Sequence, residues 1–503
     1  MQNTRNYSCK NCSERGKDCD GAEPICNLCI RDGLLCSGSE PLIRALPHAS
    51  LSWEPPESSH IFDEPLANTS GLLQRAISTI VSTPAWGSSY GNSHGFDSHG
   101  SLSTVYPTTL RTLSLDPRID SNTLPFILGQ YIRFLDKIAF RMPPPEVREG
   151  IMLRLRGSAI MFSVMSLGAR IFQAALDNFD NTNWPIYANL VDKLYSRICV
   201  ASKTVNDHSY LEGRLSGAIE LASFKFMTAD NATGYELVRK ETPTLLRLAY
   251  QYPELWSKRG MISLSQVMLC EKYEIFSFTW TDNIAAMVLG TPTFLPYDTT
   301  TLTNRSKFQT EWMWGCPEVF IIQCARINRS RSLRGEYSDQ RRWKGIEKEL
   351  VEWEPVSESS NDSRDTVARL AVQESWRHAM LIYLYMAICG VNSADPRVDA
   401  SVNQITKLVR TVKHTDSFDR HLFVPCLIVG ACARSESQRA LVETKLSSMK
   451  AMKIWVLRSA DFTAVLEHLW HGAAKDGRAT TWNDYIQSRR AILPVSEGNT
   501  PVF

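Results

Sequence analysis

The segment CKNCSERGKDCDGAEPICNLCIRDGLLC, residues 9–36, decides how the rest of this chain is interpreted. It contains the half-motif C-x2-C-x6-C twice, separated by six residues. A zinc ion takes four thiolate or imidazole ligands in a tetrahedron, and a C-x2-C pair supplies two of them. Two zinc ions need eight ligand positions, so six cysteines suffice if two sulfurs are shared, and the repeat suggests the leading Cys9 and Cys26. The pattern predicts two zinc ions bound by Cys9, Cys12, Cys19, Cys26, Cys29 and Cys36.

Two other arrangements of the six cysteines stay open. One is a disulfide framework, and the other is a single zinc ion on four cysteines with two left over. The first residues, Met1 to Ser8, are polar and show no apolar signal-peptide core. We therefore expect a reducing nuclear or cytosolic compartment, where metal ligation is favoured over disulfides.

The spacing resembles that of the fungal zinc binuclear cluster transcription factors. The resemblance covers about the first 40 residues and includes Asp20 and Gly21 after the third cysteine and Pro24 two residues before the fourth. It implies a nuclear, DNA-binding regulator of RNA polymerase II genes. In such proteins the first helix of the cluster enters the major groove and contacts a CGG triplet.

The chain departs from this family in the helix that would contact DNA. The family carries C-R-x-R-K-x-K-C there, whereas this chain has Cys12-Ser-Glu-Arg-Gly-Lys-Asp-Cys19. Arg15 alone keeps its basic position, and a guanidinium can donate two hydrogen bonds to guanine O6 and N7. Arg15 is therefore the predicted base contact, while Lys10 and Lys17 are predicted to contact phosphates.

The charge of the cysteine segment predicts weak DNA binding by the isolated module. Residues 1–40 hold five Lys or Arg and six Asp or Glu. Phosphate neutralisation supplies most non-specific DNA affinity, so an anionic module should need a second subunit or another DNA-bound factor. The alternative is a zinc-stapled module that has lost DNA readout and acts through protein contacts, which Glu14 and Asp18 favour.

Residues 41–122 are predicted to be a mostly disordered linker, because they are rich in Ser, Pro, Gly and His. Within it, Gly71 to Ser82 has apolar residues at helical spacing and is predicted to dock as a short helix on the large domain. No sustained heptad follows the cysteines, so the oligomeric state stays open.

Residues 123–493 are predicted to form a large all-helical domain, followed by a tail at 494–503. Apolar residues recur there with helical period, and strand-like alternation is nearly absent. Single helices are predicted over Leu124–Arg141, Tyr235–Tyr252 and Glu311–Asn328, among others. Ala379 to Cys389 is the longest apolar run, too short to span a bilayer, and no membrane partner is expected. The fold class is all-α, with a small two-zinc module and a disordered linker ahead of a multi-helix domain.

The large domain also resembles the fungal-specific regulatory domain found downstream of such clusters, for example at Leu215–Ala222, Lys272–Ile275 and Trp376–Met386. This implies activation or repression through transcriptional co-regulators. Catalytic motifs such as GxSxG, HExxH, a Walker loop or GxGxxG after a strand do not occur, so no enzyme is predicted.

Three features of the large domain have competing interpretations. His468 and His471 could share a metal, but solvent-facing or capping histidines are favoured. The aromatic strip Tyr273, Phe276, Phe278 and Trp280 either lines a ligand cavity or is core. A basic cluster is an exposed face, a nuclear import signal or a phosphate contact. Its members are Arg326, Arg329, Arg331, Arg334, Arg341, Arg342 and Lys344. The remaining seven cysteines lack ligand spacing and are predicted to be buried thiols.

Overall fold

The computed structural model describes residue 12, residues 15–17, and residues 122–177, 184–201, 208–300, 311–333, 340–355, 363–412, 418–450 and 457–497. The predicted linker 41–122, apart from residue 122, and the predicted docking helix Gly71–Ser82 lie outside these residues. The chain divides into two compact units. The smaller comprises Pro47–Lys137 and Pro144–Asn178, and the larger comprises Met1–Leu46, Ile138–Pro143 and Phe179–Phe503.

The described part of the smaller unit is helical. Its helices are α5 (Thr123–Ile138), α6 (Glu146–Gly157) and α7 (Ala159–Asp177). Phe134 of α5 stacks on Phe172 of α7, with ring centroids 3.8 Å apart, and Tyr131 meets the same ring edge-on. By length and composition α7 could cross a membrane, but 56% of that window is buried inside the fold, as in core helices of soluble proteins.

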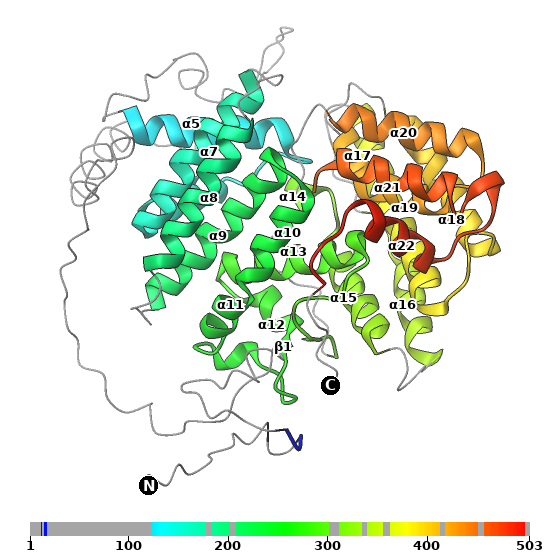
Figure 1. The fold of residues 1–503 in the computed structure, drawn as a ribbon, viewed down its shortest axis with the longest axis horizontal. Helices are drawn as coiled ribbons and strands as arrows, with labels where there is room; N and C mark the ends of the chain where they lie inside the picture. Colours follow the sequence, from blue (N-terminus) through cyan, green and yellow to red (C-terminus); the bar gives the residue numbers. More distant parts are fainter. Residues whose placement is uncertain are drawn as a thin grey trace, which may run out of the picture. The chain divides into compact units, whose positions relative to one another are not determined.

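The larger unit begins with helices gathered around α9 (Figure 1). These are α8 (Trp184–Ala201), α9 (His208–Thr228), α10 (Asn231–Lys240), α11 (Thr242–Ala249), η4 (Pro253–Leu255), α12 (Leu264–Leu269) and α13 (Tyr273–Leu289). Fourteen residues of α13 are buried, from Ile275 to Leu289, which makes it a central helix of this group. The two-residue strands β1 (Ile262–Ser263) and β2 (Tyr297–Asp298) pair in parallel beside it.

The rest of the larger unit is also helical, and Figure 1 shows α17 to α22 lying together. Its elements are α14 (Glu311–Trp314), α15 (Glu318–Ser332), α16 (Gln340–Glu352), α17 (Ser363–Leu384), the π-helix η5 (Tyr385–Cys389), α18 (Pro396–Thr411), η6 (Asp419–Leu422), α19 (Phe423–Cys432), α20 (Glu436–Lys450), α21 (Ser459–His471), η7 (Lys475–Gly477) and α22 (Trp482–Ile492). The all-α prediction is confirmed for the described residues, and the apolar run Ala379–Cys389 is a helical segment, mostly buried.

Local chemistry explains where several helices begin. The Asp230 side chain accepts a hydrogen bond from Thr233 N at the start of α10, and Asp395 caps α18 just before Pro396. Thr481 and Asp484 form a reciprocal capping box at the start of α22. Such side chains satisfy N–H groups that have no partner within the helix.

Two of the predicted single helices are wrong. The predicted helix Tyr235–Tyr252 is interrupted at Glu241, which ends α10 and precedes α11 with Pro243 in its first turn. The predicted helix Glu311–Asn328 is interrupted between α14 and α15, where Gly315 takes φ +67° and Pro317 precedes α15. A Cβ at residue 315 would lie 3.0 Å from Phe140 and 3.1 Å from His421. This position therefore requires glycine, both for its backbone and for its contacts.

Buried ion pairs tie the helices of the larger unit together. Lys445 of α20, 2% exposed at its side chain, pairs with Asp419 of η6, and the same ammonium donates to the Val412 carbonyl at 2.7 Å. Glu241 is fully buried and accepts two hydrogen bonds from Arg214 at 3.0 Å and one from Tyr195 at 2.8 Å. Losing either partner would leave a buried charge, so these pairs hold their helices in one arrangement.

Candidate functional site

The described part of the cysteine segment is a capped helical turn. Cys12 is helical with a fully buried side chain, and the backbone N–H of Lys17 donates to the Cys12 carbonyl at 3.0 Å. Gly16 lies between them with φ +61°. A hydrogen bond from residue i+5 to the carbonyl of residue i, with a glycine in the left-handed conformation just before the donor, is typical of a Schellman motif. This motif ends a helix and provides a donor for one of its last carbonyls. The turn therefore ends at Arg15, the predicted base contact.

Gly16 is one of the positions where the chain lacks the basic residue of the zinc-cluster family. The structure gives this glycine a role in ending the turn, because left-handed backbone is costly for residues with a Cβ. Lys17 is exposed beyond the cap. Arg15 is partly buried, and Lys10 lies outside the described residues.

Of the six cysteines predicted to bind zinc, only Cys12 lies within the described residues. The thiol of Cys12 is fully buried, and burial of this kind is compatible with a thiolate ligand, which must be shielded from water. Cys9, Cys19, Cys26, Cys29 and Cys36 lie outside the described residues. Elsewhere, the described side chains form no group of three His, Cys, Asp or Glu that could hold a metal ion.

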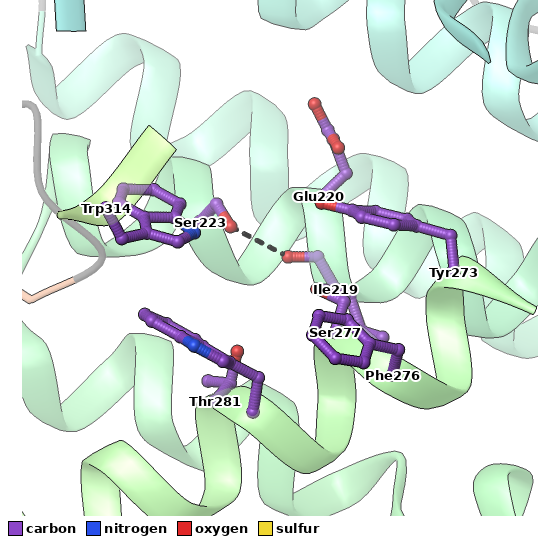
Figure 2. Close-up of a pocket in the computed structure, with 9 residues that line it drawn as sticks. Ile219, Glu220, Ser223, Tyr273, Phe276, Ser277, Thr281 and Trp314 are labelled. Carbon is purple, nitrogen blue, oxygen red and sulfur yellow. Dashed lines mark hydrogen bonds between the residues drawn. The ribbon is translucent and has the colours of Figure 1, made fainter. Parts of the chain in front are cut away.

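A second candidate site is a pocket between α9, α13 and α14, with a cavity of about 50 Å³. Tyr273, Phe276 and Trp280 of α13 line it together with Trp314 of α14. The rings of Trp280 and Trp314 stack, with centroids 5.5 Å apart and planes inclined by 25°. Figure 2 shows Trp314 on one side of the pocket and Tyr273 with Phe276 on the other. The predicted aromatic strip therefore does line a cavity, except for Phe278, which is fully buried in the core.

Polar groups from α9 and α13 complete the pocket wall. Ser277 and Thr281 lie on α13, and Glu220 and Ser223 lie on α9. The Ser223 hydroxyl donates to the carbonyl of Ile219, which also lines the pocket, at 3.2 Å (Figure 2). Drug-sized ligands occupy cavities of about 300–1,000 Å³, so this pocket has room only for a small chemical group.

The position of Trp314 depends on contacts made by the rest of α14. Glu311 pairs with Arg141 at 2.8 Å and accepts from Gln373 of α17 at 2.5 Å. The N–H of Arg141 also donates to the carbonyl of Trp312 at 2.8 Å, and Gly315 ends the helix. These contacts fix a four-residue helix that would be unstable alone, because a single turn costs more conformational entropy than its hydrogen bonds return.

The other candidate residues have structural partners. His468 lies 3.1 Å from the Ser488 hydroxyl through Nδ1, and Nδ1 of His471 lies 2.8 Å from the Glu467 carbonyl oxygen. Both histidines are exposed, as the favoured interpretation predicted. Burial raises the pKa of Cys324 and that of Cys426 to about 12, which makes these thiols unreactive.

The basic cluster is partly used within the fold. Arg326 of α15 pairs with Glu349 of α16 at 2.8 Å. Arg331 donates hydrogen bonds to the carbonyls of Ala286 and Thr291 near the end of α13. A positive charge at the C-terminus of a helix stabilises that helix. Arg334 and the side chains of Arg341 and Arg342 lie outside the described residues. Arg326 therefore forms an exposed ion pair between two helices, whereas Arg331 is partly buried against the end of α13.

Comparison with known protein families found a similarity in the C-terminal half of the chain. Residues 261–495 match the family described as "Fungal specific transcription factor domain". No curated protein and no solved structure matches the chain. The matched residues run from just before β1 to just beyond α22. This match supports a transcription regulator with a regulatory, non-enzymatic role, and it suggests a nuclear protein.

Sequence reasoning missed the α14 and α9 contributions to the pocket. Trp314 lies 34 residues after Trp280, and Glu220 lies 53 residues before Tyr273. No local periodicity relates such distant residues. The one available signal was the Gly315-Cys316-Pro317 sequence, which could have predicted that Trp314 ends a short helix.

Proposed function

We propose that this protein is a nuclear regulator of RNA polymerase II genes that binds a CGG-like half-site through a two-zinc cysteine cluster. The proposal is carried by one observation, the repeated C-x2-C-x6-C spacing upstream of a fungal-specific transcription factor domain in the same chain. Zinc, when bound, would hold the six cysteines in place, since a 28-residue segment has little apolar core of its own. The helical domain would receive a signal or recruit co-regulators.

The capped turn supports a specific role for Arg15. The Schellman hydrogen bond between Lys17 and Cys12 fixes the backbone on both sides of this arginine. A rigid backbone lets the guanidinium be placed against a base edge without a large entropic cost. Lys17, exposed beyond the cap, is suited to a phosphate. Arg15 would thus specify the half-site and Lys17 would add affinity without sequence preference.

Binding-site selection with purified full-length protein tests this proposal. We expect CGG-containing sites to be enriched at low salt. The Arg15→Ala variant should bind the selected site about tenfold more weakly and lose discrimination at one guanine. The matched Lys17→Ala variant should weaken binding to all sequences alike. In a plot of the logarithm of the DNA-binding constant against the logarithm of salt concentration, its slope should be smaller in magnitude by about one.

Metal analysis tests the cluster independently of DNA. The full-length protein should carry two equivalents of zinc. Replacing Cys26, the proposed bridging ligand, by Ala should cost at least as much zinc as replacing Cys29. Full zinc loading of the Cys26→Ala variant would contradict the bridging assignment.

A second function is favoured by the acidic residues Glu14 and Asp18 and by the glycine at position 16. Gly16 and Asp18 stand where the family pattern carries a basic residue, and Glu14 adds a negative charge at a variable position. The cluster would then be a folded protein-interaction module in a regulator that no longer reads DNA. Zinc loading without any sequence preference at low salt would decide in favour of this second function.

A further inference from the structure

The pocket between α9, α13 and α14 combines four aromatic rings with one negatively charged side chain. Tyr273, Phe276, Trp280 and Trp314 supply the rings, and Glu220 supplies a carboxylate. None of the described lining residues is Lys, Arg or His. The face of an aromatic ring carries partial negative charge, which attracts cations. The rings and the carboxylate therefore both favour binding of a cation and disfavour binding of an anion.

The size of the cavity limits what the cation can be. A single water needs roughly 10–15 Å³, so about 50 Å³ admits a group of about four heavy atoms. A methylated ammonium group has this size, and its methyl groups are compatible with apolar walls such as Ile219. A bare metal ion would find one carboxylate and no further strong ligand among the described lining residues, which is too few for a stable site.

We propose that this pocket binds the methylated ammonium head of a small organic cation, as an effector site of the helical domain. The stacked indoles of Trp280 and Trp314 form one wall, and Figure 2 places Tyr273 and Phe276 opposite Trp314. Because Trp314 belongs to α14, an occupant would touch three helices at once. Its binding would favour the arrangement in which Glu311 joins α14 to Arg141 and to Gln373 of α17.

Tryptophan fluorescence of the full-length protein gives a direct test, since two indoles line the cavity. Choline carries the trimethylammonium head, and 3,3-dimethylbutan-1-ol has the same shape without the charge. We expect saturable quenching by choline and at least tenfold weaker binding of the neutral isostere. Equal binding of the two compounds, or binding of neither at tens of millimolar, would overturn the proposal.

The same head group occurs in free metabolites and on methylated lysine side chains. Tetramethylammonium, choline and a trimethyllysine peptide separate these sources. A peptide that binds at least ten times more tightly than tetramethylammonium assigns the site to a modified protein. Comparable affinities of choline and the peptide assign it to a small molecule.

Two variants and a matched control link binding to this pocket. Glu220→Gln keeps the shape of the side chain and removes its charge, and Trp314→Leu removes one ring. Each should weaken choline binding about tenfold or more while leaving affinity for the neutral isostere unchanged within twofold. Trp312→Leu, on the same short helix but outside the pocket, should bind choline like the native protein. Unchanged choline affinity in Glu220→Gln and Trp314→Leu, with native circular dichroism, would refute the assignment.

Discussion

Gly16 lies within the hydrogen bond from Lys17 N to the Cys12 carbonyl, and its φ of +61° is one that L side chains rarely adopt. Replacing it by alanine should cost about 1 kcal/mol of local stability. No heavy atom lies within 4 Å of the position a Cβ would take, so the cost is conformational rather than steric. We expect Gly16→Ala to weaken zinc retention and DNA binding severalfold, as measured by chelator competition and gel shift. Asparagine tolerates this backbone, so Gly16→Asn is the control and should retain more of both activities.

Asp282 of α13 is a fully buried acid whose ionisation is coupled to folding. Burial raises its pKa to about 7. The hydrogen bonds that it accepts from Phe294 N and the Tyr297 hydroxyl, both at 2.8 Å, act to lower the pKa, but the effect of burial is larger. Between about pH 4 and pH 7 the folded protein keeps a proton that the unfolded chain loses. Stability from this group is therefore present below pH 4 and is lost as pH rises through 7.

The Asp282→Asn variant tests this pH dependence because it cannot ionise. Relative to the variant, the native protein should lose free energy of unfolding on the order of 3 kcal/mol between pH 4 and pH 8. Urea denaturation across this pH range measures the free energy of unfolding of both proteins. Subtracting the value for the variant from that for the native protein at each pH cancels the contributions of other titrating groups, such as His421. A difference that is constant with pH would show that the carboxyl ionises in the fold without penalty.

At the scale of elements, α22 is docked by side chains that satisfy the last carbonyls of α13. The Tyr485 hydroxyl donates to Val288 O at 2.5 Å, and Arg489 Nε donates to Leu289 O at 2.7 Å. Arg489 is fully buried and also pairs with Glu497. Arg490 and Arg489 hydrogen-bond to Glu497 and lower its pKa to about 2, so the chain just after α22 is held as well.

Replacing Arg489 by methionine should therefore release α22. We expect a loss of about 1.5–3 kcal/mol in the free energy of unfolding and faster amide exchange in α22 than in α17. Arg490→Met removes a guanidinium that is 48% exposed and should cost less than about 1 kcal/mol. Equal losses for the two variants would contradict the anchoring role.

The elements also show what the sequence could and could not predict. Long helices such as α5, α7 and α9 follow from apolar periodicity alone. The breaks at Glu241 and Gly315 were missed because helical periodicity continues across them, while a buried hydrogen-bond network and a close approach to His421 fix the backbone. All ten residues of α19 are buried, so this helix has no polar face.

The two candidate sites were predictable to different degrees, because one is formed by residues close together in the sequence and the other partly by residues that are far apart in it. A metal cluster is encoded by spacing within 28 residues, so sequence alone proposes its ligands. Three of the four pocket rings lie on α13, and the sequence left open whether they line a cavity or belong to the core. Glu220 and Trp314 come from distant elements, and only tertiary packing brings them to α13.

For the whole molecule, metal removal should separate the two functions of the chain. Chelation should abolish sequence-specific DNA binding, because zinc binding supplies the folding energy of the cysteine module. The helical domain uses no metal in this proposal, so circular dichroism at 222 nm and its thermal midpoint should change little. Restoring zinc should restore DNA binding. A large loss of helicity on chelation would mean that the metal supports the helical domain instead.

The π-helix η5 interrupts the long α17 run with five residues, Tyr385 to Cys389, before Gly390 turns the chain in the left-handed conformation. Such a segment accommodates one residue more than a regular helix of the same rise. Deleting a residue there would remove the extra residue that the wide turn accommodates, so the chain would have to leave the helix from a narrower, regular turn. The connection from α17 to α18 therefore depends on the number of residues in this segment as well as on their identity.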